Sequence, residues 1–207
     1  MHTSYYKRKG RKRFHRRKKT PYEPSKVRAL LNQGKYVHEK RTIEVIYLED
    51  DGAIVENLFF WGSPWQPEFC DWAFNLKRGK ECQRVSDLIP DQVQVLLTHG
   101  PPLGHGDVTS SGLRVGCEDL MYTTKSRLSN LRVHLFGHIH EGYGVTRDFN
   151  GVVYANASTC NHRYIPKHPA IVIDIPRPSD EEAKRNLGIL HSVRKKRADD
   201  AASGLVF

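Results

Sequence analysis

The sequence predicts an α/β fold, and three neighbouring stretches carry that prediction. Val93–His99 and Leu131–Phe136 are short apolar runs of strand length. Between them, Cys117–Leu128 repeats apolar residues at helical spacing, which favours an amphipathic helix that covers a sheet. A strand–helix–strand unit with a right-handed crossover places its two strands parallel and side by side. We therefore expect these two strands to be neighbours in one sheet.

The amino-terminal third predicts one short helix and then strands. Ser25 can cap a helix whose apolar face carries Val27 and which Gly34 ends. Strands are expected at Val37, at Ile43–Leu48 and at Leu58–Trp61. The acidic turn Glu49–Gly52 separates the last two.

The remaining elements follow from the same patterns. A brief helix is predicted at Gln83–Leu88, and strands at Val152–Ala155 and Ile171–Ile175. A capping box of Ser179 and Glu182 predicts a helix over Ser179–Leu190. We expect helices packed on a sheet built from residues 43–175.

Alternation within Leu131–Phe136 predicts which side of that strand is buried. Leu131, Val133 and Leu135 form one face and are expected in the core. The opposite face, which carries Arg132 and His134, is expected to be less buried.

Histidines follow both strands of the central unit. His99 ends the first strand and is followed by Gly100, and His138 and His140 follow the second strand after Gly137. Ligands of α/β folds bind at the carboxyl ends of the strands. Three neutral imidazoles there suit zinc, manganese or iron. The alternative is that they are ordinary loop histidines.

A loop of aromatic residues precedes the central unit. Trp61, Trp65, Phe69 and Trp72 lie around two prolines. They either line a pocket and stack on a base, with Trp65 as a substrate-binding candidate, or fill the edge of the core. His105 and Asn156 are further candidates for substrate contact, and a turn role is the alternative for Asn156.

The excess positive charge lies at the amino terminus. Residues 1–19 contain ten of the 33 Lys and Arg and no acid, which leaves 23 basic against 23 acidic residues elsewhere. Such a block is typical of a disordered tail. It is able to bind nucleic acid through phosphate contacts or to act as a nuclear-localisation run. The alternative is a solvated tail without a role.

Several function classes are excluded by composition. The chain has no apolar run of about 18 residues, and its polar start has no signal-like apolar region. Its four cysteines, Cys70, Cys82, Cys117 and Cys160, form neither a C-x-x-C motif nor a compact framework. We therefore expect reduced thiols in an intracellular protein, cytoplasmic or nuclear, and no membrane partner.

Four stretches together resemble the calcineurin-like metallophosphoesterases, and within them the metallophosphoesterase domain-containing branch. They are THGPPLGHGD (Thr98–Asp107), VGC (Val115–Cys117), FGHIHEGYG (Phe136–Gly144) and NASTC (Asn156–Cys160). The resemblance runs from about Val27 to Pro176. It implies a metallophosphoesterase sheet sandwich flanked by helices, incomplete in this chain.

The resemblance also implies a chemistry. Members hydrolyse phosphoesters, including phosphodiesters, at a pair of divalent ions such as Mn, Fe, Zn or Mg. A phosphoester or nucleotide is the expected small-molecule partner. His99 and His138 would hold one ion and His140 the other, with no catalytic residue expected beyond these ligands.

The chain departs from the family in its first half. The family's D-x-H and G-N-H-[DE] motifs are absent, and the one Gly-Asp pair is Gly106-Asp107, after His99. We expect little hydrolysis by these 207 residues alone, and an encoded protein that continues upstream with the missing motifs. The rival interpretation is a non-catalytic module that binds nucleic acid or a nucleotide. The expected segments are a basic tail (1–20), a partial phosphoesterase domain (21–178) and a helical or flexible appendage (179–207).

Overall fold

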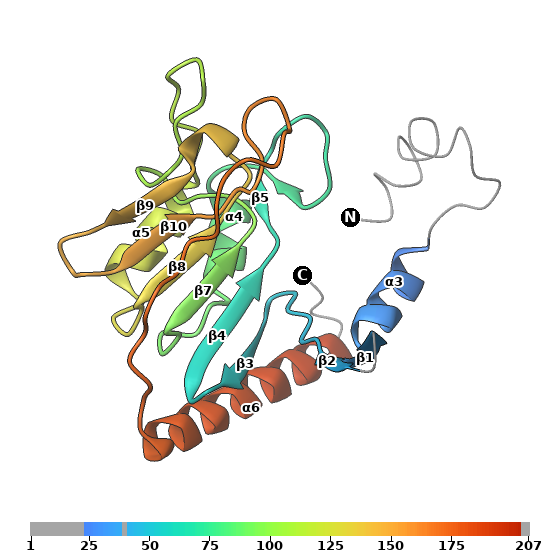
Figure 1. Cartoon of the computed structure of the whole chain (residues 1–207). Coiled ribbons are helices and arrows are strands. Elements are labelled where there is room, and N and C mark those ends of the chain that lie inside the picture. Colours follow the sequence, from blue (N-terminus) through green and yellow to red (C-terminus); the bar gives the residue numbers. More distant parts are fainter. Residues whose placement is uncertain (1–22, 39–40, 204–207) are drawn as a thin grey trace.

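The computed structural model describes residues 23–38 and 41–203, so the predicted basic tail lies outside the described part (Figure 1). Four helices and ten strands follow one another in these residues. The helices are α3 (Pro24–Leu31), α4 (Lys80–Ser86), α5 (Glu118–Ser126) and α6 (Asp180–Ala202), with a short 3₁₀ turn, η2, at His140–Gly142. The predicted α/β class is confirmed.

One mixed sheet forms the centre of the molecule. Its strand order is β3-β4-β7-β8-β10-β9. Its members are β3 (Asp51–Val55), β4 (Leu58–Ser63), β7 (Val95–Thr98), β8 (Val133–Phe136), β10 (Val153–Asn156) and β9 (Gly144–Arg147). The four inner strands are parallel, and the two edge strands pair antiparallel.

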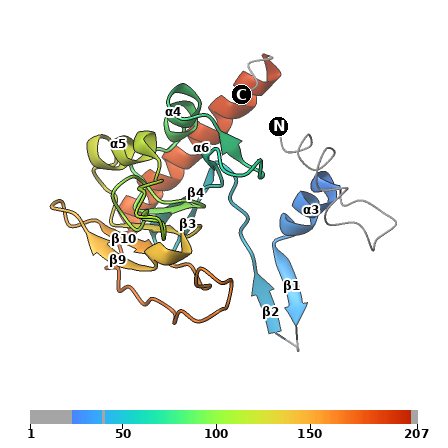
Figure 2. The same ribbon diagram turned by 90° about the horizontal axis from the view of Figure 1, so that it is seen from above.

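Two small ladders lie outside this sheet. β1 (Lys35–His38) pairs with β2 (Arg41–Glu44), and β5 (Gln66–Pro67) pairs with β6 (Asn75–Leu76). The first ladder lies with α3 to one side of the sheet (Figure 2). The predicted strand at residues 43–48 therefore ends early, at Glu44, and is not part of the main sheet.

The two faces of the sheet are covered differently. The helix face carries Phe59, Trp61, Leu96 and Tyr154, which pack with Cys82 of α4, Leu120 of α5 and Leu190 of α6. The outer face carries Leu58, Val95, Val133 and Val153, against which Ile173 and Ile175 pack. The chain near residues 169–176 crosses the sheet on the side away from α4 and α5 (Figure 1).

The predicted strand at Ile171–Ile175 is wrong. The segment packs over the outer face of the sheet and extends neither edge of the six-stranded sheet. Its isoleucines contribute apolar contact, and Arg132 Nη1 donates to the carbonyl of Pro176 at 2.7 Å.

The predicted burial of β8 is also wrong. His134 is fully buried and Phe136 is 5% exposed, because that face lies under the helices.

Two edge strands were not predicted, namely β3 and β9. The tight turn before β4 is at Glu56 and Asn57, both with positive φ. The predicted turn at Glu49–Gly52 instead leads into β3.

The helices agree well with the sequence patterns. α3, α4 and α5 lie where they were expected, although Ser25 does not cap α3, because Glu23 is the N-cap residue and Pro24 opens the helix. The capping box of α6 is confirmed, since Glu182 N donates to Ser179 Oγ at 3.2 Å.

Helix α6 is part of the folded unit. Leu190 is 2% exposed in the helix-face core, and Arg194 forms a two-pronged ion pair with Asp51 at the start of β3. The buried amide of Gln94 links the sheet to this helix. Its Oε1 accepts from Phe59 N at 2.9 Å, and its Nε2 donates to Glu182 Oε1 at 2.6 Å. The exact residue boundaries of the three predicted segments stay a prediction.

No helix of the described part is both long enough and apolar enough to cross a membrane.

Removal of the α6 core contact should destabilise the protein. We expect Leu190→Ala to lower the free energy of unfolding by about 2–5 kcal/mol, because it leaves a cavity between α6 and the sheet. Leu187→Ala is the matched control, since Leu187 is 41% exposed on the same helix, and it should cost no more than about 0.5 kcal/mol. Urea unfolding followed by tryptophan fluorescence measures both. Equal losses would show that α6 does not pack as described.

Candidate metal-binding cleft

The predicted crossover brings the histidines together. β7 and β8 are adjacent and parallel, with α5 as the connection, and each ends one or two residues before a histidine. The two loops are joined by a hydrogen bond from Gly137 N to His99 O, at 3.0 Å. As a result, His99 Nε2 lies 3.1 Å from His138 Nδ1.

The backbone at His138 is strained. Its φ is +69°, and the N–H of Ile139 donates to the carbonyl of Gly137 at 2.8 Å, which closes a three-residue turn with His138 at its centre. Such turns with positive φ are rare in non-glycine residues and occur mostly at functional sites. The turn directs the imidazole toward His99 while Ile139, 8% exposed, lies in the core.

His140 is oriented by the backbone. Its Nδ1 donates to the carbonyl of Asn161 at 2.9 Å, so the lone pair of the neutral ring is on Nε2. This is the usual arrangement of a metal-binding histidine, in which one ring nitrogen binds the ion and the other is held by a carbonyl.

Burial keeps the paired histidines neutral. It lowers the pKa of His99, and it lowers the pKa of His138 to about 4, with a further contribution from His99 and His140 nearby. A neutral imidazole has a lone pair available for a metal ion at neutral pH.

These side chains form part of the wall of a cleft of about 570 Å³. Residues from five loops surround it: Phe69, Trp72, Arg78, His99, His138, His140, Glu141, Cys160, His162 and Tyr164. Phe69 and Trp72 both meet His138 edge-on, at ring-centroid distances of 5.4 and 6.1 Å. The aromatic loop is therefore divided. Its second half lines the cleft, whereas Trp61 is fully buried in the core.

The three substrate-contact candidates lie elsewhere. Trp65 donates from Nε1 to Asp50 Oδ2 at 2.5 Å, and His105 stacks on Tyr154 with ring centroids 3.8 Å apart. Asn156 is 1% exposed, and its Nδ2 donates to the carbonyls of Gly106 and Ile139. None of the three lines the cleft.

Asn156 has a clear positioning role. It holds the loop at Gly106 against the loop at Ile139, and these loops also touch at Gly142, where a Cβ would lie 2.0 Å from Gly106 O. Buried Asp107 closes the first loop, because it accepts from Gly104 N and forms an ion pair with Arg114. The long loop after His99 is thus tied in place.

Some cleft residues had no signal in the sequence. Arg78, Glu141 and Tyr164 come from three different loops, and only the folded chain brings them to one place. His162, which was expected at the surface, is exposed and also lines the cleft.

The donor set fits one cation and not a complete pair. His99, His138 and His140 offer imidazole nitrogens that suit a transition-metal ion. Among the described residues, however, no group of three His, Cys, Asp or Glu side chains that includes His99 and His138 has all its donor atoms within 4.8 Å of one another. A carboxylate that could bridge two ions is thus not assembled with these histidines.

Comparison with known proteins gives several relatives. No protein-family model matches the chain. It is 49% identical over 134 residues, 64% of its length, to metallophosphoesterase domain-containing protein 1 of Homo sapiens and to that of Mus musculus. It is 45% identical over 131 residues to a UPF0046 protein of Caenorhabditis elegans. The chain covers 40% of the length of the first two relatives and 33% of the third.

Beneath the cleft, the buried histidine of β8 should make stability depend on pH. Burial lowers the pKa of His134 to about 3, so the ring stays neutral in the folded state, whereas the unfolded chain takes up its proton near pH 6.5. The unfolded state then binds one more proton. The free energy of unfolding should therefore fall by about 1.4 kcal/mol per pH unit for this group as the pH drops below 6.5.

The variant His134→Gln tests this dependence, because its amide can still donate to Thr98 Oγ1, which lies 2.8 Å from His134 Nε2. We expect the unfolding free energy of this variant to depend less steeply on pH between pH 6.5 and 4, by the equivalent of about one bound proton. His191→Gln is the control, at an exposed position of α6. An unchanged slope in His134→Gln would contradict the assignment.

Proposed function

From the relationship of this chain to the metallophosphoesterase domain-containing proteins, we propose that it carries part of a metal-dependent phosphoester hydrolase centre. The observation that carries the proposal is the 3.1 Å approach of His99 and His138 on the wall of the cleft. Phosphodiesters, including nucleotide esters, are the proposed substrate class, and Mn, Fe, Zn or Mg the proposed ions.

The chain's own residues would bind the cations and orient the substrate. His99 and His138 would hold one cation, and His140, oriented by the carbonyl of Asn161, would contribute to the other ion of a pair. A bound divalent ion supplies charge for the phosphoryl oxygens and lowers the pKa of a water molecule. Phe69 and Trp72 offer ring faces and edges beside His138, where the planar group of a nucleotide ester can pack.

The same geometry limits the activity of these residues alone. A cation pair needs a bridging carboxylate, and within the described residues none is grouped with the two histidines. We therefore propose that the histidine cleft binds one cation and that the 207 residues hydrolyse little, since hydrolysis needs carboxylate ligands from outside the described set.

Loss of one imidazole should weaken metal binding. We expect His138→Ala to lower the affinity for Mn²⁺ by at least about tenfold in titration calorimetry, because His138 is one of the two converging ligands. His191→Ala on the surface of α6 should leave the affinity unchanged. Two Mn²⁺ ions of micromolar affinity that are both lost in His138→Ala, or unaltered binding by His138→Ala, would contradict the proposed site. Hydrolysis of a chromogenic phosphodiester by the chain at rates typical of enzymes would contradict the proposed limit.

A second function rests on the charge distribution. Residues 1–19 hold all ten units of net charge, and the remainder is balanced. We propose that this segment binds RNA or DNA through phosphate contacts, independently of the cleft.

Deletion of residues 1–19 should abolish that binding. We expect the full chain to bind a single-stranded oligonucleotide with an affinity that falls steeply with salt, as counterion release requires. The matched control replaces Arg185, Lys195 and Lys196 with Gln, which removes exposed charge from α6 and should change little. Fluorescence anisotropy measures all three proteins. Equal affinity of the deleted chain would exclude the tail as the binding element.

A further inference from the structure

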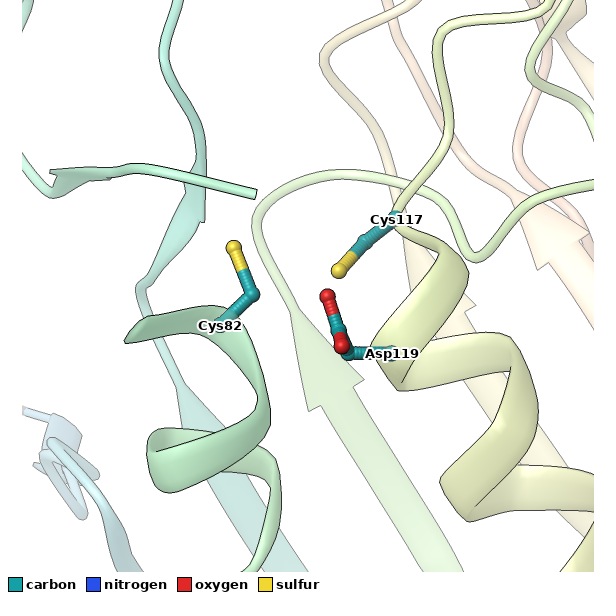
Figure 3. A group of neighbouring side chains, drawn as sticks. All are labelled: Cys82, Cys117 and Asp119. Atoms are coloured by element: carbon teal, nitrogen blue, oxygen red, sulfur yellow. The ribbon is translucent and has the colours of Figure 1, made fainter. Parts of the chain in front are cut away.

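A second group of metal-binding side chains lies away from the histidine cleft, between α4 and α5. The thiols of Cys82 and Cys117 and the carboxylate of Asp119 have their donor atoms within 4.8 Å of one another. Figure 3 shows the three side chains converging across the gap between the two helices. We propose that they form a thiolate-rich site for a zinc-type divalent ion.

The geometry suits such an ion. Zinc binds thiolate sulfur at about 2.3 Å, so two ligands of a tetrahedral ion lie about 3.8 Å apart, within the observed spread. Cys82 is 2% and Cys117 6% exposed, while Asp119 is half-buried, so the ion would have one open side. Thiolates and carboxylates are both zinc ligands, and a tetrahedral ion held by three protein ligands has one position left for water.

The surroundings favour negative charge at Cys117. It is the N-cap residue of α5, where free backbone N–H groups point toward a negative charge. Arg78 donates to the carbonyls of Val115 and Gly116, directly before Cys117, and its positive charge offsets surplus negative charge there.

An independent observation also points to a bound group. Cys82, Cys117 and Gln66 are among the residues that line a small, largely apolar cavity of about 20 Å³, enough for one water molecule. Gln66 is 4% exposed, and its Oε1 has no hydrogen-bond partner among the described residues. A water bound to the ion in its fourth position would donate to that oxygen.

Binding would release protons. Each cysteine gives its thiol proton to solvent as its sulfur bonds to the ion, while Asp119 binds as a carboxylate. No electrons are transferred, and both sulfurs stay reduced.

Cobalt(II) is the probe, because a cobalt–thiolate bond gives an intense charge-transfer absorption that imidazole and carboxylate ligands do not. The titration uses the reduced full-length chain carrying His138→Ala, which weakens the cleft site. We expect one equivalent of cobalt to produce the thiolate band and zinc to abolish it by displacement. The band should be lost in Cys82→Ser and in Cys117→Ser, and kept in Cys70→Ser, whose thiol is exposed in a loop.

Asp119→Asn covers the case in which a cysteine variant fails to fold. It keeps both thiols and should lower cobalt affinity at least about tenfold. Absence of the thiolate band, its persistence in Cys82→Ser, or unchanged affinity in Asp119→Asn would overturn the proposal. A Cys82–Cys117 disulfide in the purified chain, without cobalt uptake after reduction, would overturn it too. Since the readout is sulfur coordination, none of these outcomes depends on hydrolysis or on the histidine cleft.

Discussion

The adjacency of β7 and β8 is the constraint on which the rest of the structure depends. Each strand is only four residues long, so its end is fixed by few ladder bonds. The ladder continues past the strands through the bond from Gly137 N to His99 O. That single bond aligns the two loops, and the strained turn at His138 then directs one imidazole toward the other. Without the parallel pairing, no local feature of either loop would bring the histidines together.

This adjacency could be derived from the sequence because it depends on connectivity. A helix between two apolar runs permits one handedness of crossover, and the neighbouring strand ends follow from it. The one-residue spacing places His140 in the same loop as His138, although among the described residues its donor atom is not grouped with those of His99 and His138. The sequence therefore predicted that His99 and His138 meet, and metal binding at this place stays a prediction.

Features that depend on distant partners could not be derived in this way. His134 alternates with apolar residues as a surface residue would, yet it is fully buried and packs against the rings of Phe136 and Tyr154. The segment at Ile171–Ile175 has the composition of a strand, yet it packs over the outer face of the sheet and extends neither of its edges. Asn156 looked like a ligand or a turn residue, whereas its amide joins two loops that are 33 residues apart in the sequence. In each case the deciding contact is with a residue that the local pattern does not contain.

Helix α5 links the histidine cleft with the thiol group between the helices. It is the crossover that sets β7 beside β8, and its first residues follow Cys117 directly. Cys117 is bonded on both sides to the loop that begins at His99. Its N–H donates to Pro101 O at 2.9 Å, and its carbonyl accepts from Leu103 N at 3.0 Å. An ion held by Cys82, Cys117 and Asp119 would therefore pin α5 to α4 and restrain the loop that carries His99. The two groups differ in donor chemistry, sulfur in one and imidazole in the other, so they would select different ions while sharing one structural support.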